Sequence, residues 1–250
     1  MPPKPRVAKP KSTPPASGPK APKRSHLALA IAGAVAVAAA LIVASLVLAG
    51  GDDDSSGGTT GITTPTGLLA GIPQDDAFLG NPAADVTLIE YADLQCPICR
   101  QYSLDFFPSL VDEFVRPGNL RMEFRGLAFI GPDSEKALKF TLAAGLQNHL
   151  WDFQEALYQR QGGENSGWVT DELLREIGSS IEGLDVDQLF VDAERPEIAA
   201  QIAETAEQAS EADVEGTPWF FVKIGNEEPY HIEPRSLDEF RAALNDALEG

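Results

Sequence analysis

Apolar residues follow distinct patterns along this chain, and these patterns divide it into segments. Residues 27–49 form an unbroken apolar run without a charged residue, in which Ser45 is the one polar side chain. After residue 67, short apolar runs alternate with amphipathic stretches and with turns that contain Gly or Pro, as in a globular domain. The pattern therefore predicts a helix of membrane length, a flexible linker over residues 50–67 and one folded domain over residues 68–250.

Three apolar runs in the domain have the composition and spacing of strands. Residues 86–91 are almost continuously apolar and β-branched, which is typical of a buried strand. In residues 120–125 apolar and charged side chains alternate, which predicts a strand with one buried face. Residues 219–224 predict a third buried strand, and a turn at Gly225-Asn226 leads it into a hairpin with residues 230–232.

The other stretches have helical periodicity, and their order sets the fold class. Ser134 and Ser236 are expected to cap the helices that follow them. The apolar stripe of the last helix is expected to comprise Leu237, Phe240, Leu244 and Leu248. The predicted helices cover residues 96–115 with a kink at Pro108, 134–149, 151–161, 170–181, 187–212 with a break at Pro196, and the segment after Ser236. Strand, helix, strand, a long helical stretch, hairpin and helix together predict an α/β fold.

The segment before the apolar run is strongly basic. Residues 1–26 contain seven Lys or Arg and no acid, and eight prolines fall within the first 24 residues. Such a composition cannot bury a core, so we expect a disordered tail. Because positive residues stay on the cytoplasmic side, this tail is expected in the cytoplasm and the domain outside the membrane.

The apolar run itself has two interpretations. As a helix its 23 residues rise about 35 Å, enough to cross a bilayer core of about 30 Å. This length favours an uncleaved, single-pass anchor over a signal peptide, whose apolar region is usually about 7–15 residues. A cleavable signal peptide stays open, because Val47-Leu48-Ala49 is a tolerable cleavage site.

Charge and cysteine content narrow the function classes. The formal charge is −19, and outside the basic tail 12 basic side chains face 38 acidic ones. So acidic a body lacks the Lys and Arg that phosphate contacts need, which excludes nucleic acid as the expected partner. With Cys96 and Cys99 as the only cysteines, the chain is neither a disulfide-stapled miniprotein nor a four-thiolate metal protein.

The strongest chemical signal is Cys96-Pro97-Ile98-Cys99. It follows a predicted buried strand and opens a predicted helix, whose free N–H groups and partial positive charge stabilise a thiolate. We therefore expect a lowered pKa for Cys96. We also expect Cys96 to be exposed and Cys99 to be covered, so that Cys96 attacks a partner and Cys99 resolves the mixed disulfide.

The cysteine pair has two other interpretations besides the redox one. A structural disulfide would close only a tiny loop and stabilise little. A half zinc site would need two more ligands, and no spacing of ligands suggests one. No metal or cofactor is therefore expected. The histidines that could have supplied further zinc ligands are His26, His149 and His231.

Gly216-Thr217-Pro218 is a second, weaker signal. It stands directly before the strand of residues 219–224, and a proline in that place is a candidate for a cis peptide bond. If it lies near the cysteines, the Thr217 backbone would face outward and could pair with an extended substrate chain.

The ordered set of these features resembles a known family. Residues 85–91, Cys96-Pro97-Ile98-Cys99, the helical stretch of residues 146–161 and Gly216-Thr217-Pro218 together resemble a membrane-anchored, DsbA-like thiol–disulfide oxidoreductase of the thioredoxin superfamily. The resemblance covers roughly residues 75–248. It implies a thioredoxin fold with an inserted helical subdomain at about residues 132–212.

The resemblance also implies roles for individual residues. Cys96 would be the nucleophile, Cys99 the resolving thiol and Pro218 a cis-proline beside them, with Thr217, Pro97 and Ile98 contacting substrate. Glu90 stands in the strand before the cysteines, where the superfamily often places an acid. If Glu90 is buried near Cys99, it could take and return that thiol's proton. The alternative is a glutamate that turns to solvent.

One departure from the family leaves the direction of electron flow open. Strongly oxidising members carry His where Ile98 stands, and isoleucine cannot donate to a thiolate, so a less oxidising pair is expected. The expected function is disulfide formation in exported, cysteine-containing proteins through a redox-active Cys96–Cys99 disulfide, which a membrane redox partner reoxidises. A reductase or isomerase is the second hypothesis, and a non-catalytic peptide-binding module with this fold is the third.

Overall fold

The computed structural model describes residues 67–250. The predicted basic tail of residues 1–26, the membrane helix of residues 27–49 and nearly all of the linker lie outside the described residues, so they stay predictions. Within residues 67–250, no helix is both long enough and apolar enough to cross a membrane.

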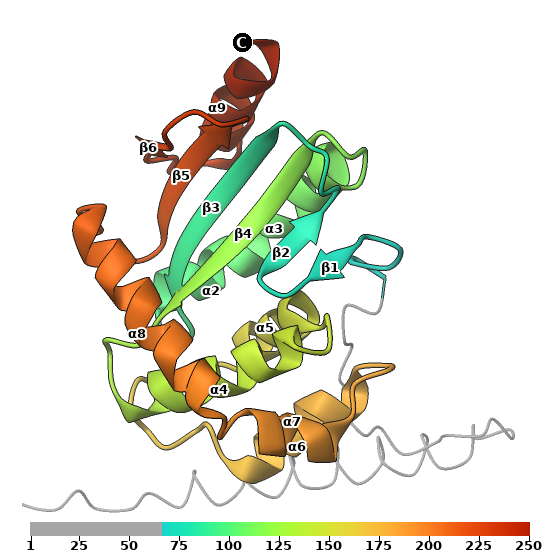
Figure 1. The fold of residues 1–250 in the computed structure, drawn as a ribbon, viewed down its shortest axis with the longest axis vertical. Coiled ribbons are helices and arrows are strands. Elements are labelled where there is room, and N and C mark those ends of the chain that lie inside the picture. Colours follow the sequence, from blue (N-terminus) through green and yellow to red (C-terminus); the bar gives the residue numbers. More distant parts are fainter. Residues whose placement is uncertain (1–66) are drawn as a thin grey trace, which may run out of the picture. The chain divides into compact units, whose positions relative to one another are not determined.

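A mixed six-stranded sheet forms the centre of the domain (Figure 1). Its strand order is β1-β2-β4-β3-β5-β6, in which β3 and β4 pair in parallel and all other neighbours are antiparallel. Strands β1 and β2 were not predicted, because two or three residues are too few to show a period. The strands are β1 (Gln74–Asp75), β2 (Phe78–Gly80), β3 (Val86–Asp93), β4 (Leu120–Leu127), β5 (Trp219–Ile224) and β6 (Tyr230–Ile232).

Along the chain, the helices and the predicted strands occur in the expected order. Thr170 and Ser236 cap α6 and α9 by accepting the backbone N–H groups of Leu173 and Glu239. The helices are α2 (Pro97–Asp105), α3 (Phe107–Leu110), the π-helical turn η1 (Val111–Val115), α4 (Pro132–Gly145), α5 (Leu150–Gln159), α6 (Asp171–Ser180), α7 (Val186–Asp192), α8 (Pro196–Glu211) and α9 (Leu237–Glu249).

Pro108 interrupts the predicted helix of residues 96–115, as expected: α2 ends at Asp105, and Pro108 lies in the first turn of α3. Two other details of the helix prediction were wrong. Ser134 does not cap α4, which begins at Pro132; its hydroxyl instead donates to Asp93. Leu248 is 37 % exposed, because it lies in the last turn of α9, beyond the buried stripe.

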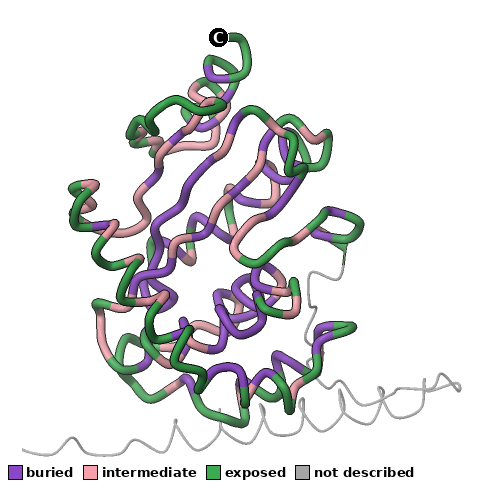
Figure 2. The backbone as a smooth tube through the Cα atoms, viewed as in Figure 1, coloured by how far each residue is buried: buried purple, intermediate pink, exposed green. Residues whose placement is uncertain are grey.

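The two faces of the sheet bury different sets of side chains. Figure 2 shows the central strand β3 coloured as buried over most of its length. On β3, Leu88 belongs to the main core, whereas its neighbour Ile89 belongs to a smaller cluster with Ala209 of α8. Figure 1 shows α2 and α3 behind the central strands, while α8 contacts β4. Glu90 shares the parity of Leu88 and therefore points into the main core.

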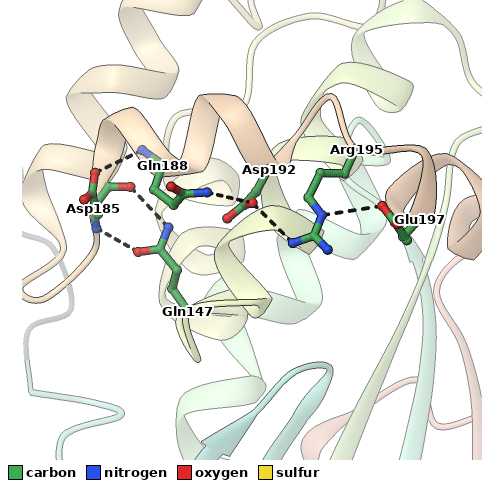
Figure 3. Close-up of polar contacts among 6 residues, drawn as sticks. All are labelled: Gln147, Asp185, Gln188, Asp192, Arg195 and Glu197. Atoms are coloured by element: carbon green, nitrogen blue, oxygen red, sulfur yellow. Dashed lines mark hydrogen bonds and ion pairs between the residues drawn. The ribbon is translucent and has the colours of Figure 1, made fainter.

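Helices α4–α8 make up the segment between β4 and β5. Hydrogen bonds and ion pairs connect several of them (Figure 3). The amide of Gln147 pairs with both backbone groups of Asp185, at 2.8 and 3.1 Å. The buried carboxylate of Asp192 accepts hydrogen bonds from Gln188 and Arg195. The two Gln147 bonds satisfy both backbone groups of Asp185, the N-cap residue of α7.

Candidate active site

Cys96 is the N-cap residue of the helix that carries Cys99. Its backbone is extended, with φ −66° and ψ 120°, and Pro97 takes the first helical position. A residue before proline favours this conformation, and a proline at that position loses no hydrogen bond. The sulfur of Cys96 accepts a hydrogen bond of 3.3 Å from the backbone N–H of Cys99. The motif therefore aims a helix N-terminus at the sulfur that is expected to react.

The thiol of Cys96 is correspondingly acidic. Its pKa falls from an ordinary 9.0 to about 6, chiefly because the Cys99 thiol donates to it, with further help from the Thr217 side chain and the N–H groups of Cys99 and Ile98. Burial opposes this shift. In its protonated form the thiol lies 3.3 Å from the Thr217 carbonyl oxygen, to which it donates. The lowered pKa agrees with the prediction from the motif.

Cys99 is the deeper of the two thiols. Both cysteines are free, so the structure shows the dithiol form. Burial, then the neighbouring Cys96, raises the pKa of Cys99 well above its ordinary value. The expectation that Cys96 would be exposed was wrong: it is only 6 % exposed, against 0 % for Cys99, because the Thr217 carbonyl contacts its sulfur.

The loop before β5 lies beside the cysteines. The Thr217-Pro218 peptide bond is cis, as the sequence predicted. Thr217 is half-buried and its carbonyl turns toward Cys96, while Pro97 and Ile98 are exposed. A groove of about 470 Å³ opens there. Its lining includes Ile98, Tyr102, Phe106, Thr217, Pro218 and Trp219.

Glu90 lies in the protein interior behind the cysteines. It is 0 % exposed, and within the described part of the chain neither carboxylate oxygen has a hydrogen-bond partner. Burial raises the pKa of Glu90 well above its ordinary value, and the charges of Glu155 and Cys96 raise it further. The alternative of a solvent-facing glutamate is therefore wrong.

Metal-binding geometry is absent from this part of the chain. Among residues 67–250, no group of three or more His, Cys, Asp or Glu side chains is placed to hold a metal ion. His149 precedes α5 and His231 lies in β6, where its ring stacks on Trp219 at 4.2 Å.

The family follows from comparison with known proteins. A family model described as thioredoxin matches residues 73–246. The chain belongs to the thioredoxin family. A relative from Bacillus anthracis, named probable disulfide bond formation protein D, is 28 % identical over 68 % of this chain and 77 % of the relative.

Solved structures show the same fold as this thioredoxin-family chain. Oxidised BdbD from Bacillus subtilis is 24 % identical, with a TM-score of 0.63 over 72 % of this chain and 98 % of that chain. The α-DsbA1 protein of Wolbachia pipientis is 21 % identical, with a TM-score of 0.61 over 70 % of this chain and 91 % of that chain. These structures show the fold, and the family match together with the Bacillus anthracis relative confirms the predicted resemblance to DsbA-like thiol–disulfide oxidoreductases.

Several polar residues of this thioredoxin-family site were missed from the sequence. Asp93, Gln95, Ser103, Ser134 and Glu155 are all buried around the cysteines. On a helix or in a loop a polar side chain predicts a solvated position, so the sequence pattern hides them. One signal was available for Ser103, because it follows Cys99 by four residues and so shares its helix face.

Proposed function

We propose that the chain forms disulfide bonds in exported, cysteine-containing proteins, by exchange through Cys96-Pro97-Ile98-Cys99. One observation carries the proposal: Cys96 is an N-cap thiol with a pKa of about 6 beside a covered Cys99. A thiol of this kind leaves a mixed disulfide readily, which favours passing the disulfide on. The name of the Bacillus anthracis relative, probable disulfide bond formation protein D, supports the same direction.

The proposed cycle begins with the oxidised pair. A substrate thiolate attacks the sulfur of Cys96, the Cys96–Cys99 bond breaks, and Cys99 leaves as a thiolate that takes up a proton. A second substrate thiolate then attacks the substrate sulfur of the mixed disulfide and releases the Cys96 thiolate. The substrate gains one disulfide and loses two electrons and two protons, and the pair becomes a dithiol.

In this scheme Glu90 donates a proton to the Cys99 thiolate and later accepts it back. Its carboxyl is buried in the core, and burial favours the protonated form by raising the pKa of Glu90 well above its ordinary value. It can therefore give a proton to the leaving Cys99 and take it back when the pair is reoxidised. Thr217, Pro218, Pro97 and Ile98 would hold the substrate segment next to Cys96.

The location and the partner belong to the same proposal. Residues 27–49 would anchor the chain as a single-pass membrane protein, with the N-terminus in the cytoplasm and the catalytic domain outside. A membrane redox partner would accept the two electrons and restore the disulfide, which serves in place of a cofactor.

The reduction potential of the cysteine pair tests the direction of electron flow. The chain is equilibrated in glutathione redox buffers, alkylated and weighed by mass spectrometry. A value of about −120 to −180 mV supports disulfide formation. A value at or below about −250 mV points to the reductase alternative, which then needs a reducing membrane partner.

Replacing Cys96 with Ser separates exchange from simple binding. An exchange enzyme loses its function in cells with this change, because the attacking sulfur is gone. A peptide-binding module with the same fold keeps its function, and that outcome would overturn the proposal.

A further inference from the structure

Two residues shortly before Cys96, Asp93 and Gln95, form hydrogen bonds with the helical insertion. Asp93 accepts a hydrogen bond of 2.6 Å from Ser134, in the first turn of α4. Gln95 donates to Ser134 at 3.0 Å and accepts from the backbone N–H of Asn165 at 2.6 Å. Asp93 and Gln95 are both at most 1 % exposed, so these bonds lie inside the protein.

Gln161 makes the attachment nearest to the reactive sulfur. It follows α5 by two residues, and its side-chain amide donates to the carbonyl oxygens of Leu94 at 2.9 Å and Cys96 at 3.1 Å. One amide group thus bridges the Leu94–Gln95 and Cys96–Pro97 peptide units. The side chain of Gln161 is half-buried, where such bonds are protected from water.

The Cys96 carbonyl is the part of the motif that needs such an anchor. The peptide between Cys96 and Pro97 has no N–H, so this oxygen is its only hydrogen-bonding group. It accepts from the backbone N–H of Arg100 at 3.1 Å and from Gln161. Together these two donors fix the direction of the carbonyl, and with it the extended backbone of Cys96.

We propose that Gln161 of the helical insertion is a positioning residue for Cys96. Through the carbonyls of Leu94 and Cys96, it holds the N-cap geometry in which the N–H of Cys99 reaches the sulfur of Cys96. The inference rests on the proposed exchange function. It assigns to the insertion a direct part in setting the reactivity of the cysteine.

The test compares Gln161→Met with Gln147→Met in the full-length, reduced chain kept soluble in mild detergent. Methionine keeps the length of glutamine and removes its donors. Gln147 is the matched control because it also bridges two main-chain groups of the insertion, those of Asp185 (Figure 3). Alkylation of Cys96 by iodoacetamide at pH 6 is followed by mass spectrometry, which separates it from Cys99.

We expect Gln161→Met to slow this alkylation about threefold to tenfold, the equivalent of one ordinary hydrogen bond. Gln147→Met should leave the rate within about twofold, even if both variants lose the same stability in urea. Gln161→Leu, which also removes the donors and adds no charge, should slow it equally and serves as the test should the methionine variant fail to fold. The titratable groups around the two sulfurs are the same in all these variants: Glu90, Tyr102, Glu155 and Tyr158.

Two results would overturn the inference: a Gln161→Met rate equal to that of the unmodified chain, or an equal slowing in Gln147→Met. Failure of the proposed exchange function would give a different result in the same alkylation experiment. In that case Cys96 of the unmodified chain would itself react at pH 6 no faster than the cysteine of an unstructured peptide.

Discussion

Ser103 donates a hydrogen bond of 2.6 Å to Glu155 across the boundary between the cysteine helix and the helical insertion. Ser103 lies one turn beyond Cys99 on α2, Glu155 lies on α5, and both are buried. Burial raises the pKa of Glu155 to about 8, although the Ser103 bond works against this, and the charge of Asp152 adds to it. A protonated carboxyl thus stands in the interior of the site at neutral pH.

This buried acid predicts a loss of stability as pH rises. The folded pKa is about 8 and the ordinary value is 4.5, so its stabilising effect is complete below pH 4.5 and is lost as pH rises through 8. Glu90 acts in the same direction. Glu155→Gln keeps a hydrogen-bond partner for Ser103 and cannot ionise. As pH rises from 4.5 to 8, the free energy of unfolding of this variant should therefore increase by roughly 3–5 kcal/mol relative to that of the unmodified chain.

Urea unfolding at pH 5 and pH 8 measures this difference. Glu207→Gln, at an exposed position of α8, is the control and should shift the free energy of unfolding equally at both values. If Glu155→Gln also shifts it equally, the carboxyl is ionised in the folded protein and the expectation is wrong.

The side chain of Cys99 should control the acidity of Cys96. Its thiol is the main cause of the lowered pKa of Cys96, ahead of the backbone donors. We expect Cys99→Ala to raise that pKa by at least about one unit from about 6. Cys99→Ser keeps a donor and should stay closer to the unmodified chain.

Absorbance of the thiolate at 240 nm, followed against pH, gives the pKa of Cys96 in each variant. A Cys99→Ala titration that still has its midpoint near 6 would mean that the helix N-terminus alone stabilises the thiolate.

Local patterns in the sequence were enough for the elements that carry the site. The apolar run before the motif became β3, Pro97 took the first turn of α2, and the strand of residues 219–224 became β5. These features depend on neighbours in sequence, such as the restriction that Pro97 places on Cys96. The cis bond at Thr217-Pro218 was predicted from its place before a strand, with support from the resemblance.

Interactions between distant segments could not be predicted in the same way. Glu155 lies 52 residues from Ser103, and Thr217 lies 121 residues from Cys96. No periodicity links such pairs, because their contact depends on how the insertion packs against the sheet. The wrong N-cap at Ser134 has the same cause, since its hydroxyl donates to Asp93 on the distant strand β3.

Close packing between β4 and α4 predicts a stability effect at Gly126. A Cβ added there would lie 2.1 Å from the Cδ1 atom of Leu138, which is buried. We expect Gly126→Ala to destabilise the domain by about 1–3 kcal/mol, as overpacked cores do. Unfolding in urea measures this, with Gly163→Ala as the control because its Cβ would have no neighbour closer than 3.9 Å.

The second variant Gly126→Ala/Leu138→Val checks the cause. If the overpacking arises at Leu138, the shorter side chain should restore part of the loss. Equal destabilisation in the single and double variants would place the clash elsewhere, for example at Phe124, whose ring lies 2.9 Å from the added atom.

Ile98 is expected to set substrate affinity without setting the acidity of Cys96. It is 57 % exposed at the edge of the groove, so a bound peptide would cover it. Ile98→Ala removes apolar contact area but keeps the backbone N–H that helps the Cys96 thiolate. We expect KM for a reduced cysteine peptide to rise about threefold to tenfold, with kcat and the pKa of Cys96 unchanged.

The assay follows oxidation of a fluorescent two-cysteine peptide, with oxidised glutathione as the final oxidant. Val191→Ala is the matched control, because Val191 is an equally exposed apolar residue (64 %) on α7 that does not line the groove. A lower kcat with an unchanged KM would show instead that Ile98 acts on the chemical step, since the groove contact would then matter only in the transition state.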